Sequence, residues 1–278
     1  MTIARRIDPA LLLVAPAAVY LAFVYALPLA LLLAKSVWTP AGLSFASFVA
    51  FFSDPFSFRV LGNTLRIALW TTLVCLLIGY PVAFALARAK GWAQTALLVA
   101  LILPLSVGVV VKAFAWQILL RRDGLVSSTL VNLGIVDEPL RLLFTETGLV
   151  IGAVNVFLPF MVLPLYSVVR QIDPRLMEAG ATLGAGPLYA FRRILLPLTL
   201  PGAVTGIAFV FSLSIAMYVI PSLLIGDRFQ TLATLTGRSF LFMRNERLGS
   251  TTATVLLVVA TSVVVGSSWL ARRMGSAR

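Results

Sequence analysis

Residues 178–197 read EAGATLGAGPLYAFRRILLP, a polar and basic stretch that lies between two long apolar segments. Just before it, Asp173 favours a helix start, and Glu178 would lie in the first turn of that helix. Gly184 predicts a break, and the residues from Leu188 onward predict a second short helix. The stretch therefore predicts a helix-turn-helix that lies outside a bilayer and connects two membrane spans.

Apolar runs on both sides of this stretch are each long enough for the roughly 20 residues with which a helix crosses the hydrocarbon of a bilayer. We predict spans over residues of about 10–35, 64–87, 92–119, 147–169, 199–225 and 249–271, with the polar loop over 171–197. The first run follows Arg5 and Arg6 as a signal peptide would, but it is longer than the apolar region of about 7 to 15 residues in such peptides. The chain is thus predicted to be an all-α membrane protein, with residues 1–278 forming a single domain of six spans.

The composition supports a membrane protein and excludes several kinds of chemistry. Hydrophobic residues make up 60% of the chain and charged residues 12%, and the mean hydropathy is +1.02, whereas about a quarter of the residues of a soluble domain are charged. Histidine is absent and Cys75 is the only cysteine, so we expect no intrachain disulfide and no transition-metal site of the usual kind. The sequence also lacks the G-x-x-x-x-G-K-[ST] phosphate loop, so we expect the chain neither to be an enzyme nor to hydrolyse ATP by itself.

The net charge of +12 comes from basic residues in short segments between the spans. A nucleic-acid-binding protein would instead gather them on a soluble domain, so we expect no nucleic-acid partner. Arg5 and Arg6 precede the first span, and Arg272 and Arg273 follow the last. Because basic residues accumulate on the cytoplasmic side of spans, we predict that both termini are cytoplasmic.

The spacing within 178–197 follows a pattern: E-A-A, three residues, G, nine residues, then I-x-L-P. The matching residues are Glu178, Ala179, Gly180 in place of the second alanine, Gly184, Ile194, Leu196 and Pro197. This pattern resembles the cytoplasmic coupling loop in the membrane subunits of binding-protein-dependent ABC importers. An ordinary basic, helical loop between two spans is the alternative, but it leaves the spacing unexplained.

The resemblance implies a type I ABC importer permease fold in a bacterial inner membrane. The first short helix of the loop would then lie in a groove of a cytoplasmic ATPase subunit, with Gly184 allowing the sharp turn. The implied partners are an ATPase dimer, which binds the ATP, a second permease subunit in a hetero- or homodimer, an extracytoplasmic solute-binding protein and the lipid bilayer. The chain itself is expected to bind no cofactor.

Five further stretches resemble the spermidine and putrescine permeases of this family. They are NTLRIALWTT from Asn63, LIGYPVAFALA from Leu77, LGIVDEPLRLLFT from Leu133, LPFMVLPLYS from Leu158 and RRILLPLTLPG from Arg192. The resemblance implies import of a polyamine. Permeases for phosphonates, opines, sulfate or iron share the same helical core, so another solute stays open. An ion-coupled secondary transporter would need carboxylates inside the spans, and none is apparent in the sequence.

Polar and aromatic residues within the predicted spans are the candidates for a solute path. They are Lys112 and Trp116 near the outer end of the third span, Asn155 in the fourth, and Ser214 and Tyr218 at i, i+4 spacing in the fifth. Each also has a structural interpretation: Lys112 can extend to the interface, Trp and Tyr occur in interfacial belts, and Asn and Ser bond helices. Lys112 in the path would suit an anion better than a polyamine. Carboxylates for a polyamine would have to come from partners or from outer residues such as Asp227 and Glu246.

Overall fold

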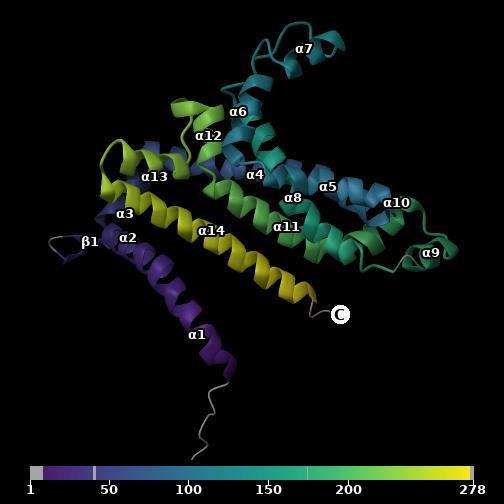
Figure 1. Cartoon of the computed structure of the whole chain (residues 1–278), viewed down its shortest axis with the longest axis horizontal. Helices are drawn as coiled ribbons and strands as arrows, with labels where there is room; N and C mark the ends of the chain where they lie inside the picture. Colours follow the sequence, from purple (N-terminus) through teal and green to yellow (C-terminus); the bar gives the residue numbers. More distant parts are fainter. Residues whose placement is uncertain (1–8, 40–41, 174, 276–278) are drawn as a thin grey trace, which may run out of the picture.

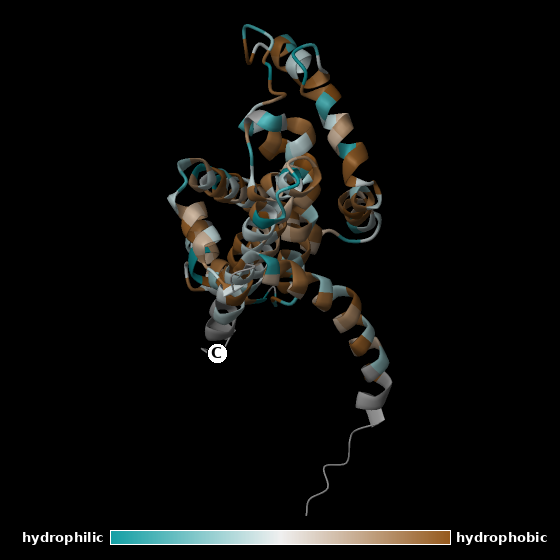
Figure 2. Cartoon of the chain, turned by 90° about the vertical axis from the view of Figure 1, so that its left-hand side faces the viewer, coloured by the Kyte–Doolittle hydropathy of each residue, from teal (hydrophilic) through white to brown (hydrophobic). Residues whose placement is uncertain are grey.

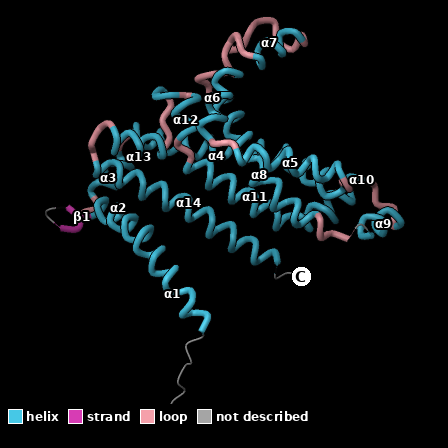
Figure 3. Tube along the Cα trace, in the orientation of Figure 1, coloured by secondary structure: helices cyan, strands magenta, loops and turns pink. Residues whose placement is uncertain are grey.

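The computed structural model describes residues 9–39, 42–173 and 175–275. Those residues are almost entirely helical (Figure 3), apart from a short antiparallel pair of strands, β1 (Trp38–Thr39) and β2 (Gly42–Leu43). The first half contains α1 (Pro9–Leu21), α2 (Leu27–Val37), α3 (Ala46–Ser53), α4 (Pro55–Arg88), α5 (Trp92–Ser106), α6 (Val109–Leu119) and α7 (Leu125–Asn132). The second half contains α8 (Glu146–Val169), α9 (Arg175–Thr182), α10 (Pro187–Ala190), α11 (Leu196–Ala216), α12 (Val219–Leu224), α13 (Leu232–Leu241) and α14 (Glu246–Gly275).

Five helical segments of the described chain are long and apolar enough to cross a membrane, and a sixth span exists if α5 and α6 are counted together. The five are Pro16–Val37, Pro55–Arg88, Glu146–Val169, Leu188–Ala216 and Glu246–Trp269. Each overlaps a span predicted from the sequence, and the all-α membrane architecture is confirmed. The boundaries shift at some ends, because helices such as α4 continue beyond the apolar run.

The expected third span, residues 92–119, is not a straight helix. Helices α5 and α6 meet at an angle of 101°, and Val107 between them has extended backbone angles. Pro104 near the end of α5 has no N–H to bond the carbonyl one turn earlier, which weakens the helix before the bend. The apolar composition predicted the length of this segment but not its change of direction.

The expected fifth span, residues 199–225, is also interrupted. Helix α11 ends at Ala216, Met217 is extended, and α12 starts at Val219. Because Pro221 cannot donate a hydrogen bond to the carbonyl of Met217, one helix could not continue through this point without losing a bond. The two helices therefore form a broken element with irregular backbone between them.

Helix α8 forms the centre of the bundle and packs against both α4 and α11, while α14 packs against α11 and α13 (Figure 1). Gly202 and Gly206 bring α11 close to α8. A Cβ atom on Gly202 would lie 3.0 Å from the carbonyl oxygen of Pro164, and one on Gly206 would lie 2.7 Å from the Sδ atom of Met161. Small residues four apart are a common device for close packing of membrane helices.

Two π-helical turns interrupt otherwise continuous helices, one at Ala22–Ala26 and one at Phe191–Leu195. In each, the N–H after the turn reaches back five residues: that of Leu27 to the carbonyl of Ala22, and that of Leu196 to the carbonyl of Phe191. A proline follows immediately in both cases, at positions 28 and 197. Proline removes one helical donor, and a widened turn accommodates the loss without ending the helix.

The first span stands apart from the bundle. Figure 2 shows α1 and α2 as an apolar arm that extends away from the body, and only α2 packs on α14. Phe23 is 70% exposed and Tyr25 is 66% exposed. An apolar helix exposed in this way is suited to contact lipid or a neighbouring membrane subunit.

Candidate functional site

The stretch 178–197 lies at one end of the bundle, and α3 and α13 lie at the other (Figure 1). Asp173 precedes this stretch and lies just before α9. Its Oδ1 atom accepts a hydrogen bond from the N–H of Arg175 at 2.9 Å. Helix α9 follows, then a turn, then α10, the π turn Phe191–Leu195 and α11. The order of helix, break at Gly184 and second helix agrees with the sequence, but the second helix is not a separate short one. It continues through the π turn into α11, so that Leu188–Ala216 is one helical segment.

Gly184 ends α9 with a φ angle of +80°. The N–H of Gly184 donates to the carbonyl of Ala181 at 3.0 Å, and the N–H of Ala185 donates to the carbonyl of Gly180 at 3.0 Å. These two bonds, with a left-handed glycine between helix and loop, form a Schellman C-cap. A Cβ atom at residue 184 would meet nothing within 4 Å, so the turn needs glycine for its backbone angle and not for space.

Gly180 and Ile194 bring the first and last parts of the stretch into contact. Gly180 is buried, and a Cβ atom on it would lie 2.8 Å from the Cδ1 atom of Ile194. The two residues also line a cavity of about 550 Å³ at the turn. This contact holds α9 against the helix that follows, and no pattern in the sequence predicted it.

The outer surface of the turn is apolar. Leu183 is 88% exposed, Leu188 66% and Tyr189 61%. Ala179 and Glu178 are exposed as well, and Glu178 forms no ion pair with any residue that the structure describes. Large apolar side chains clustered on an exposed turn are typical of a protein contact surface.

Leu196 and Pro197 join this turn to the bundle. Leu196 begins α11, and Pro197 lies in its first turn. The π turn before them keeps α10 and α11 helical without interruption. Movement of the turn would therefore be transmitted directly to α11.

The five candidates for the solute path do not meet in one cavity. Lys112 is half-buried on α6, beyond the 101° bend, and Trp116, also on α6, packs against the main hydrophobic core. Asn155 is exposed midway along α8, where its neighbours are buried. A polar side chain at that depth needs a partner subunit or a water-filled path.

Ser214 and Tyr218 are separated by the break after Ala216, so the expected i, i+4 pairing on one helix is absent. Ser214 is 2% exposed, and its hydroxyl has no hydrogen-bond partner among the described residues. Tyr218 is 39% exposed and lines a pocket of about 320 Å³. The Tyr218 ring packs closely on Gly237, where an added Cβ atom would lie 2.6 Å from its Cε2 atom.

Three other side chains give the Tyr218 pocket its chemistry. Asp227 is 88% exposed and pairs with Arg238 at 3.4 Å. The Oε1 atom of Gln230 is buried and has no hydrogen-bond partner among the described residues. The sequence indicated Asp227 as an outer acid but gave no signal for Gln230 or Arg238, because only the fold brings α12, the following turn and α13 together. Glu246, the other outer acid, is held by Lys35 at 2.7 Å.

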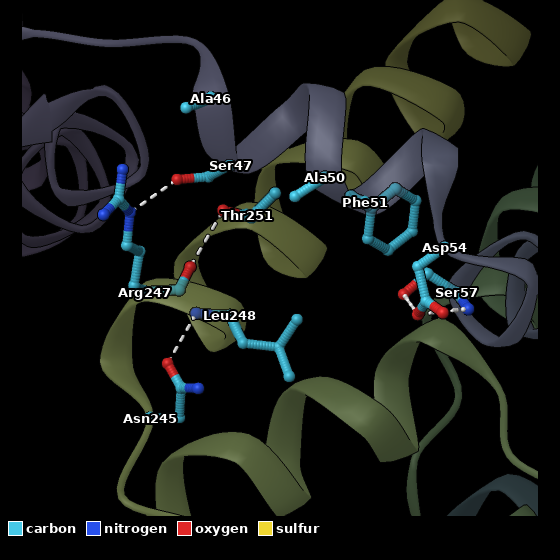
Figure 4. A pocket seen from close by; sticks show the side chains of 10 residues that line it. All are labelled: Ala46, Ser47, Ala50, Phe51, Asp54, Ser57, Asn245, Arg247, Leu248 and Thr251. Carbon is cyan, nitrogen blue, oxygen red and sulfur yellow. Dashed lines mark hydrogen bonds between the residues drawn. The ribbon is translucent and has the colours of Figure 1, made fainter.

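A second hollow, of about 470 Å³, lies between α3 and the start of α14 (Figure 4). Arg247 donates to the hydroxyl of Ser47 at 2.6 Å across it. Asp54 caps α4 by accepting hydrogen bonds from the N–H of Phe56 and from the N–H and hydroxyl of Ser57. The bonds from Ser57 hold the pKa of the Asp54 carboxyl below its usual value. This hollow lies at the end of the bundle opposite α9.

Known proteins are similar to this chain over most of its length. Residues 10–275 match the family model described as the binding-protein-dependent transport system inner membrane component. The spermidine/putrescine transport system permease protein PotB of Escherichia coli (strain K12) is 35% identical over 206 residues, covering 74% of this chain and 75% of that protein. PotB of Haemophilus influenzae (strain ATCC 51907 / DSM 11121 / KW20 / Rd) is 33% identical over 246 residues, covering 86% of each.

A similar fold occurs in a solved transporter. A chain of a bacterial alginate ABC transporter, crystallised in complex with an alginate pentasaccharide-bound periplasmic protein, superposes with a TM-score of 0.71. The match covers 94% of this chain and 93% of that chain at 18% sequence identity. At that identity the match supports the fold alone.

Proposed function

The chain belongs to the family of binding-protein-dependent transport system inner membrane components and is a permease subunit of the ABC importer class, and we propose that its solute is a polyamine such as spermidine or putrescine. The similarity to the two PotB permeases carries this proposal, because it extends over most of the chain and not over the loop alone. Import of a phosphonate, an opine, sulfate or iron by the same class of transporter is the alternative.

The chemistry of the Tyr218 pocket supports a cationic amine. The Asp227 carboxylate is exposed to the pocket and its bond to Arg238 is long, at 3.4 Å. Gln230 also lines the pocket, but its Oε1 atom is buried, so the exposed Asp227 carboxylate is the acceptor that a protonated amine would meet. The rings of Tyr218 and Phe242 also line this pocket and offer faces to a cation.

The chain would work as one part of a complex. An ATPase dimer, which binds the ATP, would receive α9, where the exposed Leu183 and Tyr189 supply an apolar contact surface. A solute-binding protein would dock at the opposite end, near α3 and the hollow in Figure 4. A second permease, identical or related, would cover apolar surface such as that of the first span.

This arrangement would also determine how the chain is oriented in the membrane. If α9 faces the cytoplasm, the end of the bundle with α3 and α13 faces outward. Helix α14 runs from the α13 end back toward the α9 end (Figure 1), so the C-terminus would be cytoplasmic. The first span runs from the N-terminal side to β1 near α3, so the N-terminus would be cytoplasmic as well, in the inner membrane of a bacterium.

The mechanism would be a rigid-body movement. Closure of the ATPase dimer would displace α9, and the continuous helix from α10 to α11 would pass that displacement to the break at Met217. Irregular backbone beside a pocket is where a bundle can change its angle. The spans would then alternate between inward-facing and outward-facing states.

Uptake into proteoliposomes that contain the complete complex tests the solute. Radiolabelled spermidine should accumulate in the lumen only when ATP is present on the side of the membrane that carries the ATPase. Excess putrescine should compete with this uptake. Sulfate, a phosphonate and ferric iron should not compete. Accumulation of one of these three instead of spermidine would refute the polyamine and leave the importer class intact.

A further inference from the structure

A pocket of about 370 Å³ lies beside α9, between the ends of α4 and α8. Its lining includes Phe84, Arg88, Val169, Arg170, Met177 and Glu178. Helix α9 contributes Met177 and Glu178 to this lining, and the pocket lies at the end of the bundle away from Tyr218.

Among the described residues, the two arginines of this pocket interact with neutral side chains and form no ion pair. The guanidinium of Arg88 lies 5.8 Å from the centre of the Phe84 ring. Arg170 donates from Nη1 to the hydroxyl of Tyr166 at 3.5 Å. Within the described part of the chain, no carboxylate oxygen lies within 4.0 Å of either guanidinium. Arg88 and Arg170 also compensate the carbonyl ends of α4 and α8, but that role leaves the pocket itself unfilled.

The charges and the walls of the pocket specify its ligand. Two guanidiniums and the carboxylate of Glu178 leave a net charge of +1, which one phosphodiester neutralises. Arginine forks match phosphate oxygens in geometry. The remaining lining is apolar and comes from Phe84, Ala87, Val169, Ile172, Met177 and Leu195. A ligand with both a phosphate and hydrocarbon fits these surfaces better than free phosphate does.

We propose that this pocket binds the headgroup phosphate of an anionic phospholipid, with Arg88 and Arg170 donating to its oxygens. Basic pockets between membrane helices at the cytoplasmic surface are suited to such headgroups. The proposal rests on the proposed function only in assigning the pocket to the leaflet that faces the ATPase. Binding itself requires neither solute nor ATP.

The pocket also connects lipid binding to transport. Met177 and Glu178 belong to α9, whereas Arg88 and Arg170 belong to the ends of α4 and α8. A bound headgroup would therefore bridge the bundle and the helix that contacts the ATPase. Anionic lipid should strengthen the coupling between ATP hydrolysis and movement of the spans.

The test compares the complete complex with a variant that carries Arg88→Gln and Arg170→Gln. Each is placed in nanodiscs of phosphatidylcholine with increasing phosphatidylglycerol, and retained lipid is measured by native mass spectrometry. We expect the apparent affinity for phosphatidylglycerol to fall about tenfold or more in the variant, the effect of losing about 1.4 kcal/mol of binding free energy. A matched control carries Arg121→Gln and Arg122→Gln, two exposed arginines distant from α9 along the chain, and should bind as the unmodified complex does.

ATPase activity provides the second readout. Solute-stimulated hydrolysis should rise with phosphatidylglycerol in the unmodified complex and in the control, and should stay flat in the double variant. Arg170→Lys keeps the charge but loses the planar guanidinium, so its affinity for phosphatidylglycerol should lie between those of the unmodified complex and the double variant. This single variant replaces the double variant if the latter fails to assemble. Equal lipid retention by all variants would overturn the proposal. Displacement of the lipid by inorganic phosphate at similar concentrations would assign the site to free phosphate instead.

Discussion

At the scale of single residues, the stretch 178–197 shows which structural features can be predicted from sequence. The break at Gly184 was predictable, because a glycine between two helical patterns indicates a left-handed C-cap. The φ angle of +80° at Gly184 confirms that prediction. The contact between Gly180 and Ile194 was not predictable, since it depends on how the chain folds back after the turn. Similarly, no sequence pattern singles out Gln230, and only the fold places this residue beside the Tyr218 pocket, with its Oε1 atom buried and without a hydrogen-bond partner among the described residues.

Gly184→Val should abolish uptake while the spans still insert. A β-branched residue in the left-handed region costs about 1–2 kcal/mol, and the turn would relax by shifting α9. Gly184→Asn should keep partial uptake, because asparagine tolerates this region better. Radiolabelled uptake checks the order Gly, Asn, Val.

Gly186→Val is the matched control for this prediction. Gly186 also has open space around its Cβ position but lies outside the left-handed region. Valine there adds the same bulk without the backbone strain, so uptake should remain. Equal loss in Gly184→Val and Gly186→Val would show that bulk on this surface, and not the backbone angle, is what matters.

Asp227→Asn should raise the KM for polyamine uptake about fivefold, which corresponds to the loss of about 1 kcal/mol from one exposed charge pair. The change also leaves Arg238 unpaired beside the pocket, where it repels a cationic solute. Glu246→Gln removes an acid from the same end of the bundle, but one that Lys35 already neutralises, so its KM should not change. A KM for Asp227→Asn equal to that of the unmodified complex would exclude Asp227 from the path.

At the scale of helices, the sequence predicted the spans well and their geometry poorly. Apolar runs define how much chain can lie in the bilayer, and five of the predicted ranges overlap long apolar helices. The bend between α5 and α6 was not predictable, because Pro104 and Gly108 lie in an unbroken apolar run that tolerates either a straight or a broken helix. For the same reason, the break between Ala216 and Val219 was not predictable. It places Tyr218 outside the helix that contains Ser214.

The packing of α8 on α11 should depend on Gly206. Gly206→Leu places a side chain against the backbone and Sδ atom of Met161, and such overpacking costs about 1–3 kcal/mol. The thermal unfolding midpoint of the purified complex should fall. Gly266→Leu, on α14, meets nothing within 4 Å and should leave the midpoint unchanged. An unchanged midpoint for Gly206→Leu would mean that the two helices are less closely packed than the structure shows.

At the scale of the whole molecule, the two candidate sites lie at opposite ends of the bundle. Helix α9 lies at one end, and α3 and α13 lie at the other (Figure 1). Residues of α13 line the Tyr218 pocket, and residues of α3 line the hollow in Figure 4. Helix α11 runs between them and is continuous with the turn. In the function that we propose, the energy for transport arrives from an ATPase at the α9 end, and the solute enters at the other end.

We propose that ATP hydrolysis by the ATPase that contacts α9 is coupled to the binding of a polyamine at the far end of the bundle. The most direct test is ATP hydrolysis by the complex reconstituted in lipid with its ATPase dimer, second permease and binding protein. Spermidine and putrescine should stimulate hydrolysis, sulfate, a phosphonate and ferric iron should not, and Gly184→Val should abolish the stimulation while basal hydrolysis persists. Stimulation by one of the other solutes, or full stimulation in Gly184→Val, would contradict the account.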